Sequence, residues 1–250
     1  MTRSIVAALL AVVSGFAGAA LAGPTTKPTV VYADNATPSS PLSRSFDGSS
    51  WTPPVAGSSA AASIAWQSIA NCPTRDELSL LSLNQSRALY VQTWDGTWWS
   101  GATQLAADCG VHTARVFACE YEQSSAQLLA VYRKANATSV YYRSYTSGSP
   151  AEQTFAMALD SAPMWMGLTP KPRSDEVVLL VATSTHLYAA VWNGAAWGNQ
   201  VTLDTAVGTL GRPYACAYMN QAGKALVAWG ATLGAPKYSC LLYTSDAADE

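Results

Sequence analysis

Histidines near acids and nucleophiles are the first residues to consider for catalysis. A Ser-His-acid mechanism needs a histidine that meets both an acid and an exposed hydroxyl. The chain has two histidines, His112 and His186, and neither lies in a G-x-S-x-G or H-E-x-x-H motif. There is also no C-x-x-C pair, no glycine-rich phosphate loop and no D-x-D-x-D series. We therefore predict no catalytic residue, no metal and no cofactor.

Arginines are the next candidates, because a sialidase-type site clamps a ligand carboxylate with clustered arginines. Arg44 and Arg143 occupy one repeated position, and Arg75 and Arg173 occupy another. Residues that repeat in register are typical of structural or multivalent sites, whereas a single asymmetric active site breaks the register. Solvated or turn-stabilising roles are therefore favoured for these arginines.

Aromatic residues carry the stronger signal for binding. Tryptophan and tyrosine offer a ring face to the C–H surface of a sugar and an N–H or O–H to orient it, and the chain has 9 Trp. One series recurs with the period of the sequence, and Trp98 stands outside it. The predicted ligand-binding residues are Trp66, Phe117, Trp165, Tyr214 and Trp98. The alternative is that the recurring series packs between neighbouring repeats.

These residues are positioned by a repeat of about 49 residues. The pattern W-[DN]-G-x-x-W, with Phe in place of the first Trp in one copy, covers residues 46–51, 94–99 and 192–197, with a degenerate copy at 145–150. Several other positions keep the same period, which excludes chance recurrence of one short motif. The apolar series is Val31, Leu80, Leu129, Leu179 and Leu226.

Within each repeat the apolar residues alternate with period two, which predicts strands and no helix. In the second repeat we expect strands around Trp66 and over 77–83, 88–94 and 98–105. The Asp-Gly or Asn-Gly pair between the last two strands predicts a tight hairpin turn with two positive φ angles. Tandem four-stranded units of this length predict an all-β β-propeller of four-stranded antiparallel blades.

The expected repeat units account for about four and a half blades, so we predict a chain truncated from a larger ring. The first unit lacks its first strand, which a propeller commonly supplies from the other end of the chain. The units are 29–55, 63–105, 114–155, 162–203 and 212–239.

The two ends of the chain do not resemble the repeats. Residues 1–22 combine Arg3, an apolar run and an A-x-A ending, which predicts a signal peptide and a secreted, periplasmic or cell-surface location. Residues 240–250 resemble a translated sequencing adapter. Without both ends, residues 23–239 carry 13 basic and 13 acidic residues, because Arg3, Asp246, Asp249 and Glu250 are removed from totals of 14 and 16. A nucleic-acid partner is therefore not expected, nor is a membrane span after signal removal.

The W-[DN]-G-x-x-W hairpins and the turn at 73–77 resemble secreted bacterial propeller repeats and, more loosely, propeller lectins and the Asp-box repeats of sialidases. The Asp-box spacing is not kept at 45–51, so sialidase activity is not transferred. The resemblance implies an exported, non-enzymatic module whose partner is a glycan or an extracellular protein. Two alternatives stay open: a sialidase-like or lyase-type enzyme completed by further blades, and a structural segment of a surface protein. Cys72, Cys109, Cys119 and Cys216 allow three fully paired disulfide patterns.

Overall fold

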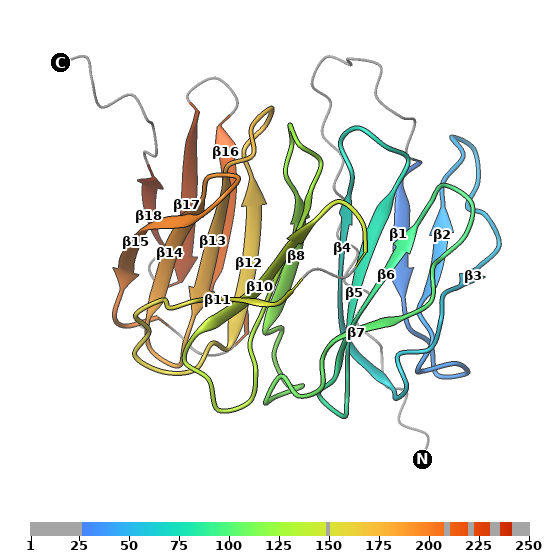
Figure 1. Ribbon diagram of the computed structural model, residues 1–250, viewed down its shortest axis with the longest axis horizontal. Helices are drawn as coiled ribbons and strands as arrows, with labels where there is room; N and C mark the ends of the chain where they lie inside the picture. Colours follow the sequence, from blue (N-terminus) through green and yellow to red (C-terminus); the bar gives the residue numbers. More distant parts are fainter. Residues whose placement is uncertain (1–26, 149–150, 208–210, 220–222, 231–235, 242–250) are drawn as a thin grey trace.

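The computed structural model describes residues 27–148, 151–207, 211–219, 223–230 and 236–241. Over these residues the chain is all-β, with eighteen strands in five antiparallel sheets and no helix (Figure 1). No candidate for a membrane-spanning helix occurs in this part of the chain. The predicted signal peptide and residues 242–250 lie outside the described residues, whereas Cys240 and Leu241 end the last strand.

Each sheet is an up-and-down meander of consecutive strands. The first sheet has β1 (Thr29–Tyr32), β2 (Leu42–Ser45) and β3 (Val55–Ala56), and the second has β4 (Ile64–Asn71), β5 (Leu78–Asn84), β6 (Leu89–Trp94) and β7 (Thr103–Ala106). The third has β8 (Phe117–Tyr121), β9 (Leu128–Tyr132), β10 (Val140–Tyr145) and β11 (Gln153–Phe155). The fourth has β12 (Trp165–Pro170), β13 (Val177–Ala182), β14 (Leu187–Trp192) and β15 (Trp197–Asp204), and the fifth has β16 (Tyr214–Met219), β17 (Lys224–Gly230) and β18 (Pro236–Leu241).

Three of the sheets have the predicted four strands in the predicted order, which confirms the four-stranded antiparallel unit. The sheets stand side by side in sequence order (Figure 1). Neighbouring sheets meet mainly through their first strands, β4 with β8, β8 with β12, and β12 with β16. In the second to fifth sheets the first strand is therefore the inner strand, and β7, β11 and β15 are the outer strands of the four-stranded sheets.

The hairpin turns differ from the predicted tight type. Asp95 and Asn193 keep negative φ, and only the following glycines, Gly96 at +95° and Gly194 at +94°, have positive φ. The turn is a four-residue loop in which the Asp95 carboxylate accepts hydrogen bonds from the Thr97 and Trp98 amides, both at 2.8 Å. Asp or Asn is thus selected for its side-chain acceptor, and glycine for its φ.

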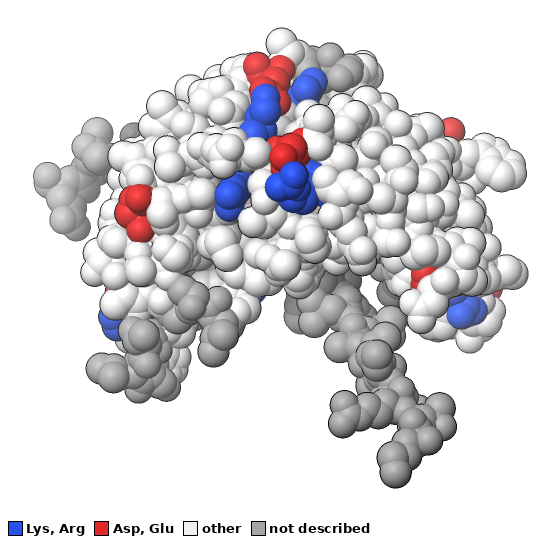
Figure 2. Space-filling model, turned by 90° about the horizontal axis from the view of Figure 1, so that it is seen from below, with Lys and Arg blue, Asp and Glu red and all other residues white. Residues whose placement is uncertain are grey.

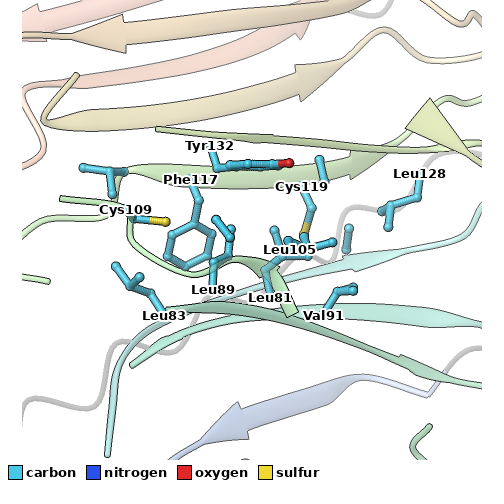
Figure 3. Packing of buried hydrophobic residues seen from close by; sticks show 14 of the residues in the cluster. Leu81, Leu83, Leu89, Val91, Leu105, Cys109, Phe117, Cys119, Leu128 and Tyr132 are labelled. Carbon is cyan, nitrogen blue, oxygen red and sulfur yellow. The ribbon is translucent and has the colours of Figure 1, made fainter. Parts of the chain in front are cut away.

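The core lies between the sheets, because the middle strands are apolar on both faces. All six residues of β13 are buried, as are all six of β14. In the cluster between the second and third sheets, Leu81, Leu83 and Leu89 face Phe117 and Tyr132 (Figure 3). A fully buried leucine or phenylalanine contributes about 1.5–3 kcal/mol, so docking of sheet on sheet is the main source of stability.

One face of the fifth sheet is uncovered. Leu80, Leu129 and Leu179 share a repeat position, and each is 0% exposed. Leu226 occupies the same position in the fifth sheet and is 38% exposed. Along β17 buried and more exposed residues alternate, so that only the face toward the fourth sheet is packed.

The repeated tryptophan at the end of each hairpin packs against the preceding sheet. The Trp99 Nε1 donates to the Ser43 Oγ at 3.0 Å, and Trp197 stacks on Phe155 with ring centroids 5.3 Å apart. Trp51 is the equivalent residue of the first sheet and is 42% exposed. Trp99 and Trp197, which follow a described sheet, therefore both pack between neighbouring sheets.

Candidate functional site

A shallow, largely open cavity of about 360 Å³ lies at the edge of the second sheet. Its lining comes from two segments, the turn between β5 and β6 and the connection from β7 to β8. Both segments lie at the edge where the inner strands begin. The lining residues are Gln85, Arg87, Gly110, Val111, His112 and Thr113.

The two segments are tied together by a short polar network. The Arg87 Nη2 lies 3.2 Å from the Asp108 Oδ2, and the Arg87 carbonyl accepts from the Cys109 amide at 2.8 Å. The Asp108 Oδ1 also accepts from the Gly110 amide at 2.7 Å. Gly110 has φ of +80°, and a Cβ there would lie 2.9 Å from the Arg133 Nη2. Both the positive φ and the close approach of Arg133 therefore favour glycine at position 110, on the rim of the cavity.

Trp66, in the inner strand β4, contacts one of the lining residues. Its Nε1 donates to the carbonyl of the lining residue His112 at 2.9 Å. Its ring lies edge to face against Trp165 of the fourth sheet, with centroids 5.4 Å apart and planes at 84°. Both rings are partly buried and pack against the cluster between the second and third sheets.

The structure separates the other predicted site residues. Phe117 is 0% exposed in the cluster between the second and third sheets, and Tyr214 is 5% exposed in the cluster between the fourth and fifth. Their positions give them a packing role, the alternative that the sequence left open. Trp98 is 70% exposed in the hairpin turn between β6 and β7, away from the cavity lining. Of the five predicted residues, Trp66 and Trp165 are therefore brought together.

The two histidines lie in different environments. His112 is exposed at the cavity, whereas the His186 Nδ1 lies 3.1 Å from the Asp160 Oδ2 and 2.7 Å from the Thr185 Oγ1. Burial acts to raise the pKa of Asp160, but hydrogen bonds from Thr183, Thr185 and Tyr188 hold it at about 2. Asp160 therefore fixes the turn between β13 and β14 to the connection that precedes β12.

Two of the repeated arginines have the turn-stabilising roles expected from the sequence. The Arg44 Nε donates to the Thr52 carbonyl at 2.6 Å, across the β2–β3 hairpin. Arg75 makes a two-point contact with Glu77, at 3.1 and 3.0 Å. Neither residue belongs to the cavity lining.

The cavity offers hydrogen-bond groups around a small apolar patch. Gln85, Arg87 and Thr113 supply side-chain donors, and Val111 supplies an apolar contact. Over the described residues no group of three or more His, Cys, Asp or Glu side chains has the arrangement of a metal site. The face seen in Figure 2 is largely uncharged, with basic and acidic side chains in small groups. The one arginine of the cavity lining is already paired with Asp108, so the site fits a neutral, hydroxyl-rich ligand better than an extended polyanion.

The sequence did not point to Gln85, Arg87, Val111 or Thr113. Arg87 does not recur in register, and the residues come from two connections about 25 positions apart, so periodicity gave no signal. The predicted architecture could have located these residues. At one edge of a propeller, the turn between the second and third strands of a unit lies beside the connection that leads to the next unit.

The fold defined by these sheets is a β-propeller, and similar solved structures share it. A fucose-specific lectin from Aleuria aurantia has a TM-score of 0.60 at 10% identity, with 86% of this chain and 70% of that chain covered. A mutant of the Aleuria aurantia lectin in complex with Fucα1-6GlcNAc has a TM-score of 0.56 at 12% identity, with 87% of this chain and 75% of that chain covered. The SapL1 lectin in complex with α-methyl fucoside has a TM-score of 0.56 at 13% identity, covering 87% and 73%. No family model and no curated protein sequence matches the chain.

Proposed function

We propose that this chain is a glycan-binding module of a β-propeller lectin. The observation that carries the proposal is the cavity at one edge of the sheets, where several hydrogen-bond donors gather around Val111 and the lining residue His112 is held by the Trp66 indole. Sugars are bound by this combination, because a ring covers their C–H face and donors orient their hydroxyls. The fucose ligands named for the similar lectins support the same class of ligand.

Arg87 has the central part in this proposal. Its guanidinium is held by Asp108 on one side and by the Gly110 carbonyl at 3.5 Å on the other, which leaves further N–H groups for a ligand. Gln85 and Thr113 then contact further hydroxyls, and Val111 contacts an apolar edge. A shallow site of this kind binds weakly on its own and gains strength when several act together.

The proposal includes export and a larger ring. The signal-like residues 1–22 support export to the periplasm, the cell surface or the medium, where glycans and surface proteins are the available partners. The exposed Leu226 and Trp51 support a ring with further blades, since equivalent residues are covered in the inner sheets. The Aleuria aurantia lectin is described as six-bladed, and the chain covers 70% of it.

A glycan array with the full chain tests the function, followed by titration with methyl α-L-fucoside and the strongest array ligand. We expect saturable binding that Trp66→Ala and Arg87→Gln each weaken at least about tenfold. Trp51→Ala is the matched control, because it removes an exposed tryptophan of the first sheet outside the cavity lining. An array with no signal, or binding that Trp66→Ala and Arg87→Gln leave unchanged, would contradict the proposal.

A further inference from the structure

A nearly buried arginine lies against the rim of the cavity. Arg133 follows β9, is 9% exposed, and does not belong to the cavity lining. Its guanidinium packs on the lining residue Gly110, since a Cβ at position 110 would lie 2.9 Å from the Arg133 Nη2 and 3.2 Å from its Nε. Glycine at this position therefore lets Arg133 approach the main chain of the connection from β7 to β8.

The same guanidinium also binds the segment that leads into the fourth sheet. The Arg133 Nη1 donates to the Pro163 carbonyl at 2.9 Å, two residues before β12 begins at Trp165. The Arg133 amide donates to the Val116 carbonyl at 3.0 Å, at the end of the connection from β7 to β8. Arg133 therefore joins the cavity rim of the second sheet to the start of the fourth sheet.

A second path of contacts joins the same two segments. Trp165 meets Trp66 edge to face, and the Trp66 Nε1 donates to the carbonyl of the lining residue His112. The connection from β7 to β8 is thus held at Gly110 and at His112, and both paths lead to residues 163–165. The position of the cavity lining therefore depends on the start of the fourth sheet.

Stability alone does not account for a cation in this place. Burial lowers the pKa of Arg133, its buried Nε has no hydrogen-bond partner, and no carboxylate lies within ion-pair distance of it among the described residues. Desolvation of such a charge is costly, and replacing a buried ionic group by an apolar one of similar volume is often neutral or stabilising. The contacts of Arg133 on its two sides therefore point to a role in placing the rim.

We propose that Arg133 is a positioning residue of the sugar site, which holds Gly110 and the adjoining residues 111–113 in the arrangement that binds the ligand. Arg133 acts through the main chain of the connection and does not touch the ligand. Binding sites depend on such supporting contacts, because a lining that is held loosely loses its geometry. This inference rests on the proposed glycan-binding function and adds that the site at the second sheet is completed by the third and fourth sheets.

Arg133→Met tests the proposal, because methionine is also long and unbranched but makes neither contact of the guanidinium. In calorimetric titration of the full chain, binding of the strongest array ligand should weaken at least about fivefold. The urea midpoint of unfolding should be unchanged or higher. Arg133→Lys should recover part of the affinity, because lysine can still donate to the Pro163 carbonyl. Arg115→Met is the matched control and should keep the affinity, because Arg115 also donates to a main-chain carbonyl, that of Met166 at 3.4 Å, but lies outside the lining.

Gly110→Ala disturbs the same contact from the other side and serves if Arg133→Met does not fold. Its methyl group would press on the Arg133 guanidinium, so the affinity should again fall at least about fivefold. Gly48→Ala is the control, because Gly48 also has positive φ, at +102°, but nothing lies within 4 Å of a Cβ there. Equal affinities of Gly110→Ala and Gly48→Ala would count against the contact with Arg133.

Hydrogen exchange of the free protein adds a measurement that needs no ligand. In Arg133→Met the amides of residues 110–113 should exchange faster than in the wild type, whereas those of β13 should exchange at the same rate. Unchanged affinity, or unchanged exchange at 110–113, would overturn the positioning role and leave the proposed function standing. Absence of binding to every glycan on the array would overturn both.

Discussion

Trp66 and Trp165 touch each other although they belong to the second and fourth sheets. Their rings meet edge to face with centroids 5.4 Å apart, on the inner side of the third sheet. Both pack against the core cluster between the second and third sheets. The pair therefore links three consecutive units at the inner strands, and Trp66 also holds the lining residue His112 of the proposed sugar site.

Removing Trp165 should loosen this junction. We expect Trp165→Ala to lower the free energy of unfolding by about 2 kcal/mol, less than for a fully buried tryptophan because the ring is partly exposed. Urea unfolding measures the change. Trp98→Ala is the matched control and should cost less than about 0.5 kcal/mol, because Trp98 is 70% exposed. Equal losses in the two variants would show that the Trp66–Trp165 contact does not stabilise the fold.

The hairpin glycines provide a second test. Gly48 and Gly194 have φ of +102° and +94°, so alanine at either position is strained by about 1 kcal/mol. A Cβ on Gly194 would also lie 2.9 Å from the Asp175 Cβ, whereas nothing lies within 4 Å of one on Gly48. Gly194→Ala should therefore cost at least about 1 kcal/mol more than Gly48→Ala in urea unfolding. The opposite order would refute the close approach of the two turns.

Glu120 should make stability depend on pH. Burial raises its pKa in the folded protein to about 8 from an ordinary value of 4.5. Its contribution is therefore fully present below pH 4.5 and is lost as the pH rises toward 8. The free energy of unfolding relative to that of Glu120→Gln should fall by about 1–3 kcal/mol over this interval.

Glu152 is the control for that measurement. Burial acts to raise its pKa, but hydrogen bonds from Lys134 and Tyr132 lower it overall. Its contribution is therefore complete above an ordinary glutamate pKa and disappears in acid, so Glu152→Gln should be the less stable protein at pH 8. A difference between wild type and Glu120→Gln that stays constant from pH 4.5 to 8 would mean that Glu120 is not buried as described.

The buried thiols should be inert until the protein unfolds. Cys72, Cys109, Cys119, Cys216 and Cys240 are all free in the structure, and the first three are buried. Burial raises the pKa of both Cys109 and Cys119 to about 12, which leaves almost no thiolate at neutral pH. In a variant that keeps only these two cysteines, a thiol reagent should react at the rate of unfolding. Rapid reaction of both thiols in the native protein would contradict their burial.

Much of the fold was predictable because the repeat imposes the same strand pattern on each unit. The alternation around Trp94 and Trp192 located the strands, and the series through Leu80 and Leu179 located the core. The turn geometry was not predictable from the Asp-Gly pair alone, since Asp95 is selected for its side-chain hydrogen bonds rather than for positive φ.

The site was less predictable, because a position in the repeat does not determine whether a ring reaches the surface. Trp66, Phe117, Trp165 and Tyr214 occupy one repeat position, yet Phe117 is fully buried whereas Trp66 is partly exposed and contacts the lining residue His112. Phe117 is a member of the cluster between the second and third sheets, whereas Trp66 packs against that cluster and contacts the connection from β7 to β8, which does not repeat. Arg87 was missed for the same reason.

Hydrogen exchange with and without bound glycan tests the central claim most directly. With the strongest array ligand at saturation, exchange should slow at the amides of residues 85–87 and 110–113, which line the cavity. Amides of the hairpin turn at 95–98, at the other edge of the second sheet, should exchange as in the free protein. Protection confined to other segments, or no protection at saturating ligand, would contradict a sugar site beside Trp66.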